Sequence, residues 1–250
     1  MLTYDPIVTL DGVSKSFNIG GPVRHTALLA VVNAVSGKEP TKKIWALKDV
    51  SFEMHKGEML GLVGSNGAGK STLLSIIAGI YQCTEGRIVV RGKVISVIGL
   101  ARGLADRLTM SDNIYLCCTF FGLSKKEITK RFDAIVKMTQ LEDFVETKLY
   151  QFSTGMLGRL VFSIAVHCDP DVLLLDEVNS NMDKDFIDFA DVIITRIAQT
   201  GVAVFAVSHK KEIIEQCHRA LWLEKGRVVA IGGARDIARR YWSDGQPASM

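Results

Sequence analysis

The sequence lacks a long apolar run, a leader-like beginning and a strong charge of either sign. Its longest apolar candidate, residues 27–35, is about half of the ~20 residues that cross a bilayer, and it contains Asn33. Residues 1–6 show neither the basic region nor the apolar stretch of a signal peptide. We therefore expect a soluble protein that reaches a membrane only through a partner.

The net charge of +3 and the five cysteines narrow the range of functions further. Basic residues are spread along the chain without the long run of a nucleic-acid-binding tail, so we expect no nucleic acid partner. The cysteines show no metal-ligand spacing and indicate no disulfide framework, which favours buried, reduced thiols in a cytoplasmic protein. The chain is rich in apolar residues. Of its 250 residues 48% are hydrophobic, enough for one large α/β domain or one domain with an insertion.

A glycine-rich stretch carries the strongest functional signal. It consists of Gly64, Ser65, Asn66, Gly67, Ala68, Gly69, Lys70, Ser71 and Thr72. Residues 58–63 are predicted to form a buried strand before it and residues 73–79 a helix after it, which is the context of a phosphate-binding loop. In such a loop backbone N–H groups hold the phosphates, Lys70 reaches the β- and γ-phosphates, and the Ser71 hydroxyl binds Mg²⁺. A chance glycine-rich turn is the alternative, but the flanking strand and helix favour the nucleotide site.

Two further strands are predicted to end in polar residues. Residues 172–175 run into Asp176 and Glu177, and residues 202–207 are followed closely by His209. Because ligands of parallel sheets bind beyond the carboxyl ends of strands, we expect Asp176 to bind Mg²⁺ and Glu177 to deprotonate an attacking water. His209 would contact the γ-phosphate or that water. A polar strand cap is the better interpretation of His209 alone, but the three strand ends together favour hydrolysis of a nucleoside triphosphate.

The remaining chain predicts strands outside the central ones and a long helical stretch. Strands are expected at residues 7–13, 50–54, 85–90 and 93–97, a hairpin at 221–231, a final helix at 234–242, and mostly helix from 99 to 168 with a capping box at 124–127. Residues 18–43 are expected to form a long loop with one short helix at 27–35. Phe17, just before this loop, would either stack on an adenine base or close the edge of the core, and the sequence does not choose between the two.

Five motifs in this order resemble those of the ATP-binding-cassette (ABC) ATPases over about residues 7–240. They are the two phosphate motifs at 64–72 and 172–177, the signature motif at 152–156 with Arg159 after it, the D-loop at 180–183 and the switch histidine His209. Thr154 and Met156 depart from the usual signature, which has glycine and glutamine there. In the D-loop, Ser180 and Asp183 match well and the two residues between them do not.

The resemblance implies a fold and a mechanism. The fold is α/β, a RecA-like P-loop NTPase core with an antiparallel β portion and an inserted α-helical subdomain. The implied ATPase domain is 1–240, with its core at 1–98 and 170–240, the helical subdomain at 99–169, and a tail at 241–250. In this family two cassettes dimerise head to tail, so Ser153 and Gly155 would contact the γ-phosphate of ATP bound by the opposite subunit. ATP and Mg²⁺ are the implied cofactors.

A subfamily is indicated as well. The signature end at 153–156, the stretches 45–52 and 108–116 and the insertion at 18–43 resemble the ATPases of bacterial exporters of O-antigen, capsular polysaccharide or teichoic acid. This resemblance implies an ATPase homodimer beneath an integral-membrane permease, bound peripherally at the cytoplasmic face of the inner membrane. It would drive export of lipid-linked polysaccharide, O-antigen being the first expectation, with the glycan handled by the membrane subunit.

Two other functions receive less support. A soluble ABC ATPase acting on DNA or the ribosome would resemble paired cassettes in one chain, or cassettes split by long coiled coils, and the sequence shows neither. The ATPase of an importer or drug exporter is disfavoured by the signature at 153–156 and by the early insertion at 18–43.

The family resemblance also implies that the segments 99–108 and 112–115 face the permease. Within 99–108, two glycines and two alanines predict a flexible, open loop. Gly99 stands where these exporters often carry glutamate, which argues against a side-chain ligand to Mg²⁺ from this segment. Arg102 and Arg107 are candidate contacts to the permease, and solvated loop arginines are the equal alternative.

Overall fold

The computed structural model describes residues 5–19, 42–176 and 183–243, and its central layer is a six-stranded sheet. The strand order is β5-β6-β7-β3-β8-β9; neighbours from β5 to β8 are parallel, and β9 is antiparallel to β8. These strands are β3 (Met59–Val63), β5 (Val94–Ser96), β6 (Val172–Asp176), β7 (Ala203–Val207), β8 (Arg219–Glu224) and β9 (Arg227–Gly233). All residues of β3 and β7 are buried, as their uninterrupted apolar runs predict for strands covered on both faces.

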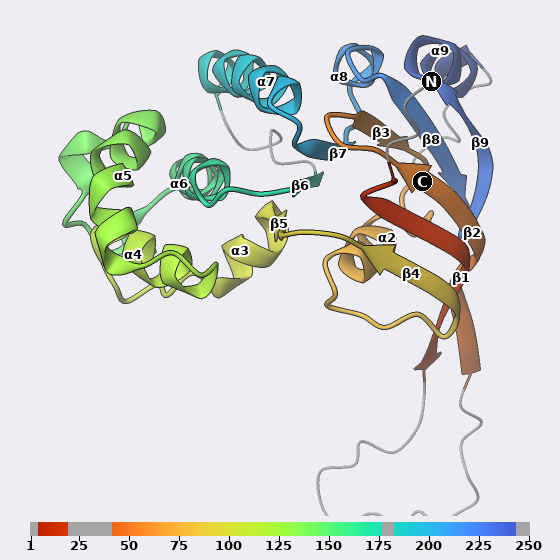
Figure 1. Cartoon of the computed structure of the whole chain (residues 1–250), viewed down its shortest axis with the longest axis horizontal. Coiled ribbons are helices and arrows are strands. Elements are labelled where there is room, and N and C mark those ends of the chain that lie inside the picture. Colours follow the sequence, from red (N-terminus) through yellow and green to blue (C-terminus); the bar gives the residue numbers. More distant parts are fainter. Residues whose placement is uncertain (1–4, 20–41, 177–182, 244–250) are drawn as a thin grey trace, which may run out of the picture.

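A three-stranded antiparallel sheet packs beside the central one (Figure 1). Its order is β2-β1-β4, with β1 (Val8–Ile19), β2 (Lys42–Met54) and β4 (Glu85–Val90). β1 and β2 are longer than the predicted strands at 7–13 and 50–54, because their outer halves carry polar residues and shifts of register that break the alternation of apolar residues. The short helix expected at 27–35 lies outside the described residues.

Side chains along β3 separate two hydrophobic cores. Leu60 and Leu62 belong to the core shared with β1, β2 and the helix α2 (Lys70–Ile77). Met59 and Val63 point to the opposite face, where the core is built with helices from the middle and the end of the chain. The sheet is therefore buried on both faces, and its polar groups are left to the strand ends.

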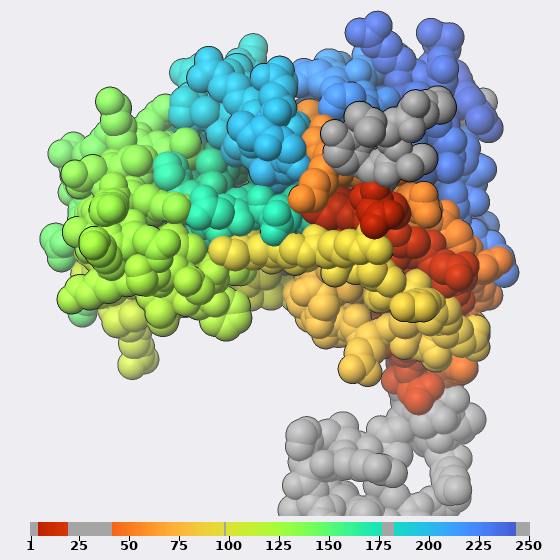
Figure 2. Space-filling model, viewed as in Figure 1, coloured from red at the N-terminus to blue at the C-terminus, as the bar shows by residue number. Residues whose placement is uncertain are grey.

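Helices fill the chain between β5 and β6, as the sequence predicts. They are α3 (Val97–Gly103), α4 (Met110–Phe120), α5 (Lys125–Thr139), the 3-10 turns η1 (Glu142–Phe144) and η2 (Leu149–Gln151), and α6 (Thr154–His167). Figure 1 shows this group, yellow to teal, beyond the β5 edge of the central sheet, and in Figure 2 it forms one end of the molecule. The later helices are α7 (Lys184–Gln199), α8 (Lys211–Glu215) and α9 (Ala234–Ser243). No helix of the described part of the chain is long and apolar enough to span a membrane.

The start of α5 confirms the predicted capping box. The Ser124 hydroxyl accepts the backbone N–H of Glu127, while the Glu127 carboxylate accepts the backbone N–H of Ser124 at 2.8 Å. Ile128, Ile135 and Val136 are buried on the face that the helical spacing indicates.

The prediction of an open, flexible loop at 99–108 is wrong. Residues 97–103 form α3, whose first turn is capped by the Ser96 hydroxyl accepting the Gly99 N–H at 3.2 Å. The following turn is fixed by the fully buried side-chain amide of Asn113. Its oxygen accepts the Ala105 N–H at 2.8 Å, and its nitrogen donates to the carbonyls of Ala105 and Thr109 at 3.1 and 2.8 Å. The amide supplies the hydrogen bonds that a loose loop would leave to water.

The cysteines agree with the expectation of buried thiols. Cys117, Cys118, Cys168 and Cys217 are buried and free, and Cys83 is half-buried. Burial raises the pKa of Cys117 to about 11 and that of Cys217 to about 12, so both stay protonated at neutral pH.

Candidate functional site

The sheet order brings the three predicted strand ends side by side. β6, β7 and β3 are neighbouring parallel strands, and Asp176, Val207 and Leu62 lie in one row across them. The carboxyl ends of these strands therefore bring together the phosphate loop after β3, Asp176 at the end of β6 and His209 after β7. Glu177, the predicted base, lies outside the described residues, as do Ser180, Asn181 and Met182.

The loop at 64–72 requires its glycines for close packing. A Cβ on Gly64 would overlap the carbonyl oxygen of Leu223 in β8. Gly69 has a φ of +106°, and a Cβ there would lie 2.6 Å from the Ala46 carbonyl oxygen. The loop is thus pressed against the central sheet on one side and β2 on the other, in a backbone form that a side chain would prevent.

Lys70 opens helix α2 and turns back over the loop. Its side chain is buried, and its Nζ donates to the carbonyl oxygens of Gly64 at 2.7 Å and Ser65 at 3.0 Å. The ammonium and the N-terminus of α2 place positive charge at one point, which suits a phosphate group.

Ser71 and Asp176, the two predicted Mg²⁺ ligands, meet directly. The Ser71 hydroxyl donates to Asp176 Oδ2 at 3.0 Å. A hydroxyl and a carboxylate are oxygen ligands of the kind that Mg²⁺ prefers, so this pair fits the ion.

Phe17 lies half-buried in the outer part of β1, beside a second ring. The rings of Phe17 and Tyr81 pack edge to face with centroids 5.4 Å apart, and Lys15 Nζ lies 5.2 Å from the first and 5.5 Å from the second. Tyr81 follows the phosphate-loop helix and is 40% exposed. Sequence reasoning missed Tyr81 and Lys15, although an aromatic residue soon after the helix was a usable signal. Adenine stacking by Phe17 stays a prediction.

Ser153 and Gly155 begin α6, away from the phosphate loop of the same chain. The Ser153 hydroxyl caps the helix by accepting the Met156 N–H at 3.2 Å, and its side chain is exposed. Figure 1 shows α6 among the helices beyond β5, whereas α2, which the loop precedes, lies on the other side of β5, at the level of β4.

Arg159 connects the signature helix α6 to α7. It forms an ion pair with Asp183, which caps α7 by accepting the Phe186 N–H at 3.0 Å, and its guanidinium lies 4.9 Å from the Phe186 ring. The hydrogen bond from Arg159 lowers the pKa of Asp183. Sequence reasoning placed both residues in motifs but did not pair them.

Sequence reasoning also missed Glu224, at the end of β8. Ser65 Oγ donates to Glu224 Oε1 at 2.6 Å, across 159 residues of chain. No local pattern signals this contact, since it depends on β8 being the neighbour of β3.

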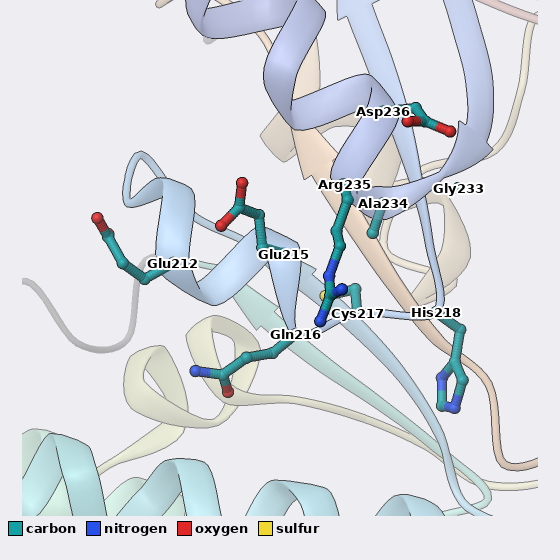
Figure 3. A pocket seen from close by; sticks show the side chains of 9 residues that line it. All are labelled: Glu212, Glu215, Gln216, Cys217, His218, Gly233, Ala234, Arg235 and Asp236. Carbon is teal, nitrogen blue, oxygen red and sulfur yellow. The ribbon is translucent and has the colours of Figure 1, made fainter.

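A polar hollow lies between α8 and α9, at the end of the sheet where the parallel strands begin (Figure 3). Glu212 and Glu215 stand on α8, Arg235 reaches down from α9, and His218 lies at the start of β8. His218 Nδ1 accepts the N–H of Met59, which begins β3, whereas the phosphate loop follows the end of β3. This hollow is therefore separate from the nucleotide site.

Comparison with known proteins agrees with this geometry. The family model described as ABC transporter matches residues 47–180. The O-antigen export system ATP-binding protein RfbB of Klebsiella pneumoniae is 37% identical over 244 residues, which cover 95% of this chain and 98% of that protein. The teichoic acids export ATP-binding protein TagH of Listeria innocua is 35% identical over 212 residues, 82% of this chain and 63% of that protein.

Solved structures show the same fold. A dimeric structure of a post-hydrolysis state of the ATP-binding cassette MJ0796, bound to ADP and Pi, superposes with a TM-score of 0.76 at 24% identity, covering 91% of this chain and 99% of that one. The matched family model and the relatives that span most of the sequence decide its classification. The chain belongs to the ABC transporter family, in which it is an ATPase.

Proposed function

We propose that this ATPase drives the export of a lipid-linked polysaccharide, O-antigen being the first candidate, across the bacterial inner membrane. The observation that carries the polysaccharide class is the 37% identity to an O-antigen export ATP-binding protein over nearly the full length of both chains. The relative named for teichoic acid export supports the same class of cargo with a different glycan.

For the nucleotide, we assign roles according to the contacts at the sheet edge. The backbone of residues 64–72 and Lys70 hold the phosphates, and the Ser71 hydroxyl and the Asp176 carboxylate hold Mg²⁺. The bound ion offsets phosphate charge. The sequence motifs carry the remaining roles, in which Glu177 takes the proton of the attacking water, His209 contacts the γ-phosphate or that water, and Phe17 packs against adenine.

The second half of each site comes from another copy of the chain. Ser153 and Gly155 stand at the N-terminus of the 14-residue helix α6, where backbone N–H groups and the helix dipole favour an anion. Because Ser153 is exposed and α6 lies among the helices, its counterpart is the γ-phosphate held by the opposite subunit.

The membrane partner docks in an apolar groove between α2, β5, α3 and α4. Ile80, Leu100, Leu116, Phe120 and Phe121 line it, and it encloses about 450 Å³. Phe120 is 84% exposed and Leu116 46%, an unusual exposure for such large apolar side chains. Gly99 also lines the groove, so the absence of a side chain there leaves room for an inserted segment. The occupant is an apolar cytoplasmic helix of the permease, which holds the ATPase peripherally at the membrane.

Surface polysaccharide in a strain that lacks the gene tests the function. We expect polysaccharide to be lost, to accumulate inside on its lipid carrier, and to return with the parent gene but not with Glu177→Gln. Normal surface polysaccharide in the deletion strain would refute export of this cargo while leaving the ATPase assignment intact.

A further inference from the structure

We infer that Glu224 is a positioning residue for ATP binding, which acts by fixing Ser65 and thereby the conformation of the phosphate loop. The inference rests on the proposed nucleotide site at 64–72 and adds to it a residue from the far end of the chain.

The contact between the two side chains is short and directional. Ser65 Oγ donates to Glu224 Oε1 at 2.6 Å, in a half-buried position. A hydroxyl bonded to a carboxylate at this distance is a charge-assisted hydrogen bond, which is stronger than a neutral one. It anchors the second residue of the loop to the last residue of β8.

The turn after Glu224 holds the loop at a second point. The Gly226 N–H donates to the Ala68 carbonyl at 2.9 Å, and the Gly226 carbonyl accepts the Lys48 N–H from β2 at 2.8 Å. The loop is therefore tied at Ala68 through backbone alone and at Ser65 through the Glu224 side chain. A substitution at Glu224 removes the contact at Ser65 and leaves the backbone contact at Ala68.

The hydrogen bond between Ser65 and Glu224 matters because the position of the Lys70 ammonium depends on Ser65. Lys70 Nζ donates to the carbonyl oxygens of Gly64 and Ser65, so the position of Ser65 sets where the ammonium sits before a phosphate arrives. A loop held in its binding form loses less conformational entropy when it takes up a ligand. Loss of the tie should weaken ATP binding without changing the chemistry that follows.

The Glu224 carboxylate has a second, opposing effect. A negative charge beside the loop repels phosphates, so removing it favours binding while removing the hydrogen bond disfavours it. The two effects separate in a comparison of Glu224→Ala with Glu224→Gln. Both variants lack the charge, but the glutamine amide oxygen still accepts the Ser65 hydroxyl. The difference in MgATP affinity between the two variants therefore measures the hydrogen bond to Ser65 alone.

The experiment is a titration of MgATP into the full chain, with four variants followed by calorimetry and by steady-state turnover. They are Glu224→Ala and Glu224→Gln, each alone and each combined with Ser65→Ala. We expect the alanine variant to bind about threefold to tenfold more weakly than the glutamine variant when Ser65 is present, the effect of one hydrogen bond. With Ser65→Ala the difference should vanish. In the two variants that change Glu224 alone, KM should follow the affinity, and kcat at saturating ATP should stay unchanged.

The control is the same pair of substitutions at Glu53, an exposed carboxylate of β2 near the turn that precedes β3. Both Glu53 variants should bind alike. If Glu224→Ala fails to fold, Ser65→Ala alone serves, because it breaks the same bond from the loop side and should weaken binding.

Three outcomes overturn the inference while the nucleotide site stands. These are equal affinities of the two Glu224 variants, a difference that persists with Ser65→Ala, and a loss that falls on kcat instead of KM. A parent protein that does not bind MgATP would overturn the nucleotide site itself, and the role of Glu224 with it.

Discussion

Ser71 on α2 and Asp176 at the end of β6 lie 105 residues apart in the chain and are joined by a 3.0 Å hydrogen bond. Because Asn keeps an oxygen acceptor for Ser71, Asp176→Asn removes the charge while sparing the bond. We expect turnover to fall and the Mg²⁺ concentration for half-maximal turnover to rise, while ATP binding in excess chelator is retained. Asp171→Asn, at the other end of β6, is the matched control. An unchanged Mg²⁺ requirement in Asp176→Asn would exclude Asp176 as a ligand.

Glu177→Gln separates binding from hydrolysis. The amide keeps the shape of the side chain and cannot take a proton, so MgATP should bind with nearly parental affinity. Turnover should fall by about 10²–10⁴-fold, the usual contribution of a general base. The closed dimer should accumulate and be visible by gel filtration in the presence of ATP. Parental turnover would show that another group is the base.

Gly155→Asp tests the shared site. A carboxylate at the start of α6 would repel the phosphate offered by the opposite subunit and would not touch the loop of its own chain. We expect hydrolysis to be abolished and the affinity of the isolated monomer for ATP to stay nearly intact. Loss of ATP binding by the monomer would mean that α6 serves its own site.

The apolar groove is tested by Phe120→Asp. Ionised aspartate resists burial against an apolar partner, so the ATPase should no longer co-purify with the permease and surface polysaccharide should be lost. Hydrolysis by the isolated subunit should continue. Val229→Asp, an exposed apolar position on β9, is the control and should leave export normal. Normal export in Phe120→Asp would exclude the groove as the docking surface.

The double variant Arg102→Glu, Arg107→Glu tests whether charged residues of α3 and of the turn after it also contact the permease. Both arginines are exposed, one in the last turn of α3 and one in the turn after it. We expect export to fail while hydrolysis by the isolated subunit survives. If export is normal here but lost in Phe120→Asp, docking depends on apolar contact and the arginines are solvated.

The ion pair between Arg159 and Asp183 predicts a pH dependence of stability. The pKa of Asp183 is lowered in the folded protein, so the ionised carboxylate stabilises the fold at pH values above its unfolded pKa of about 4. That stability is lost as the pH falls through the lowered pKa. Asp183→Asn keeps a capping side chain for α7 and removes the charge. Its unfolding midpoint should be lower than the parent's at pH 7, and the gap should close in acid. A gap that is constant down to pH 3 would contradict the assignment.

The parts of the fold that follow from local chemistry could be predicted from the sequence. β3, β6 and β7 are continuous apolar runs, and the reciprocal hydrogen bonds of Ser124 and Glu127 are a property of four adjacent residues. The edge shared by the phosphate loop, Asp176 and His209 also followed, because parallel strands place their carboxyl ends together whatever their order.

The rest depended on contacts between distant residues. Gly99 and Gly103 favoured a loop, but the Ser96 cap and the burial of Val97 and Leu100 against the helical core stabilise α3 instead. Similarly, the partner of Ser65 is decided by the position of β8 beside β3, which no spacing in the sequence reveals.

The tie between Ser65 and Glu224 has a consequence for how the protein is made. The phosphate loop is synthesised early, but the residues that hold it, Glu224 and Gly226, come off the ribosome some 160 residues later. Contacts of such long sequence separation form late in folding. The nascent chain can therefore fix Ser65 and Ala68 of its nucleotide-binding loop only after β8 and the turn behind it have joined the sheet, so the stabilisation that ATP gives is greatest from that point on.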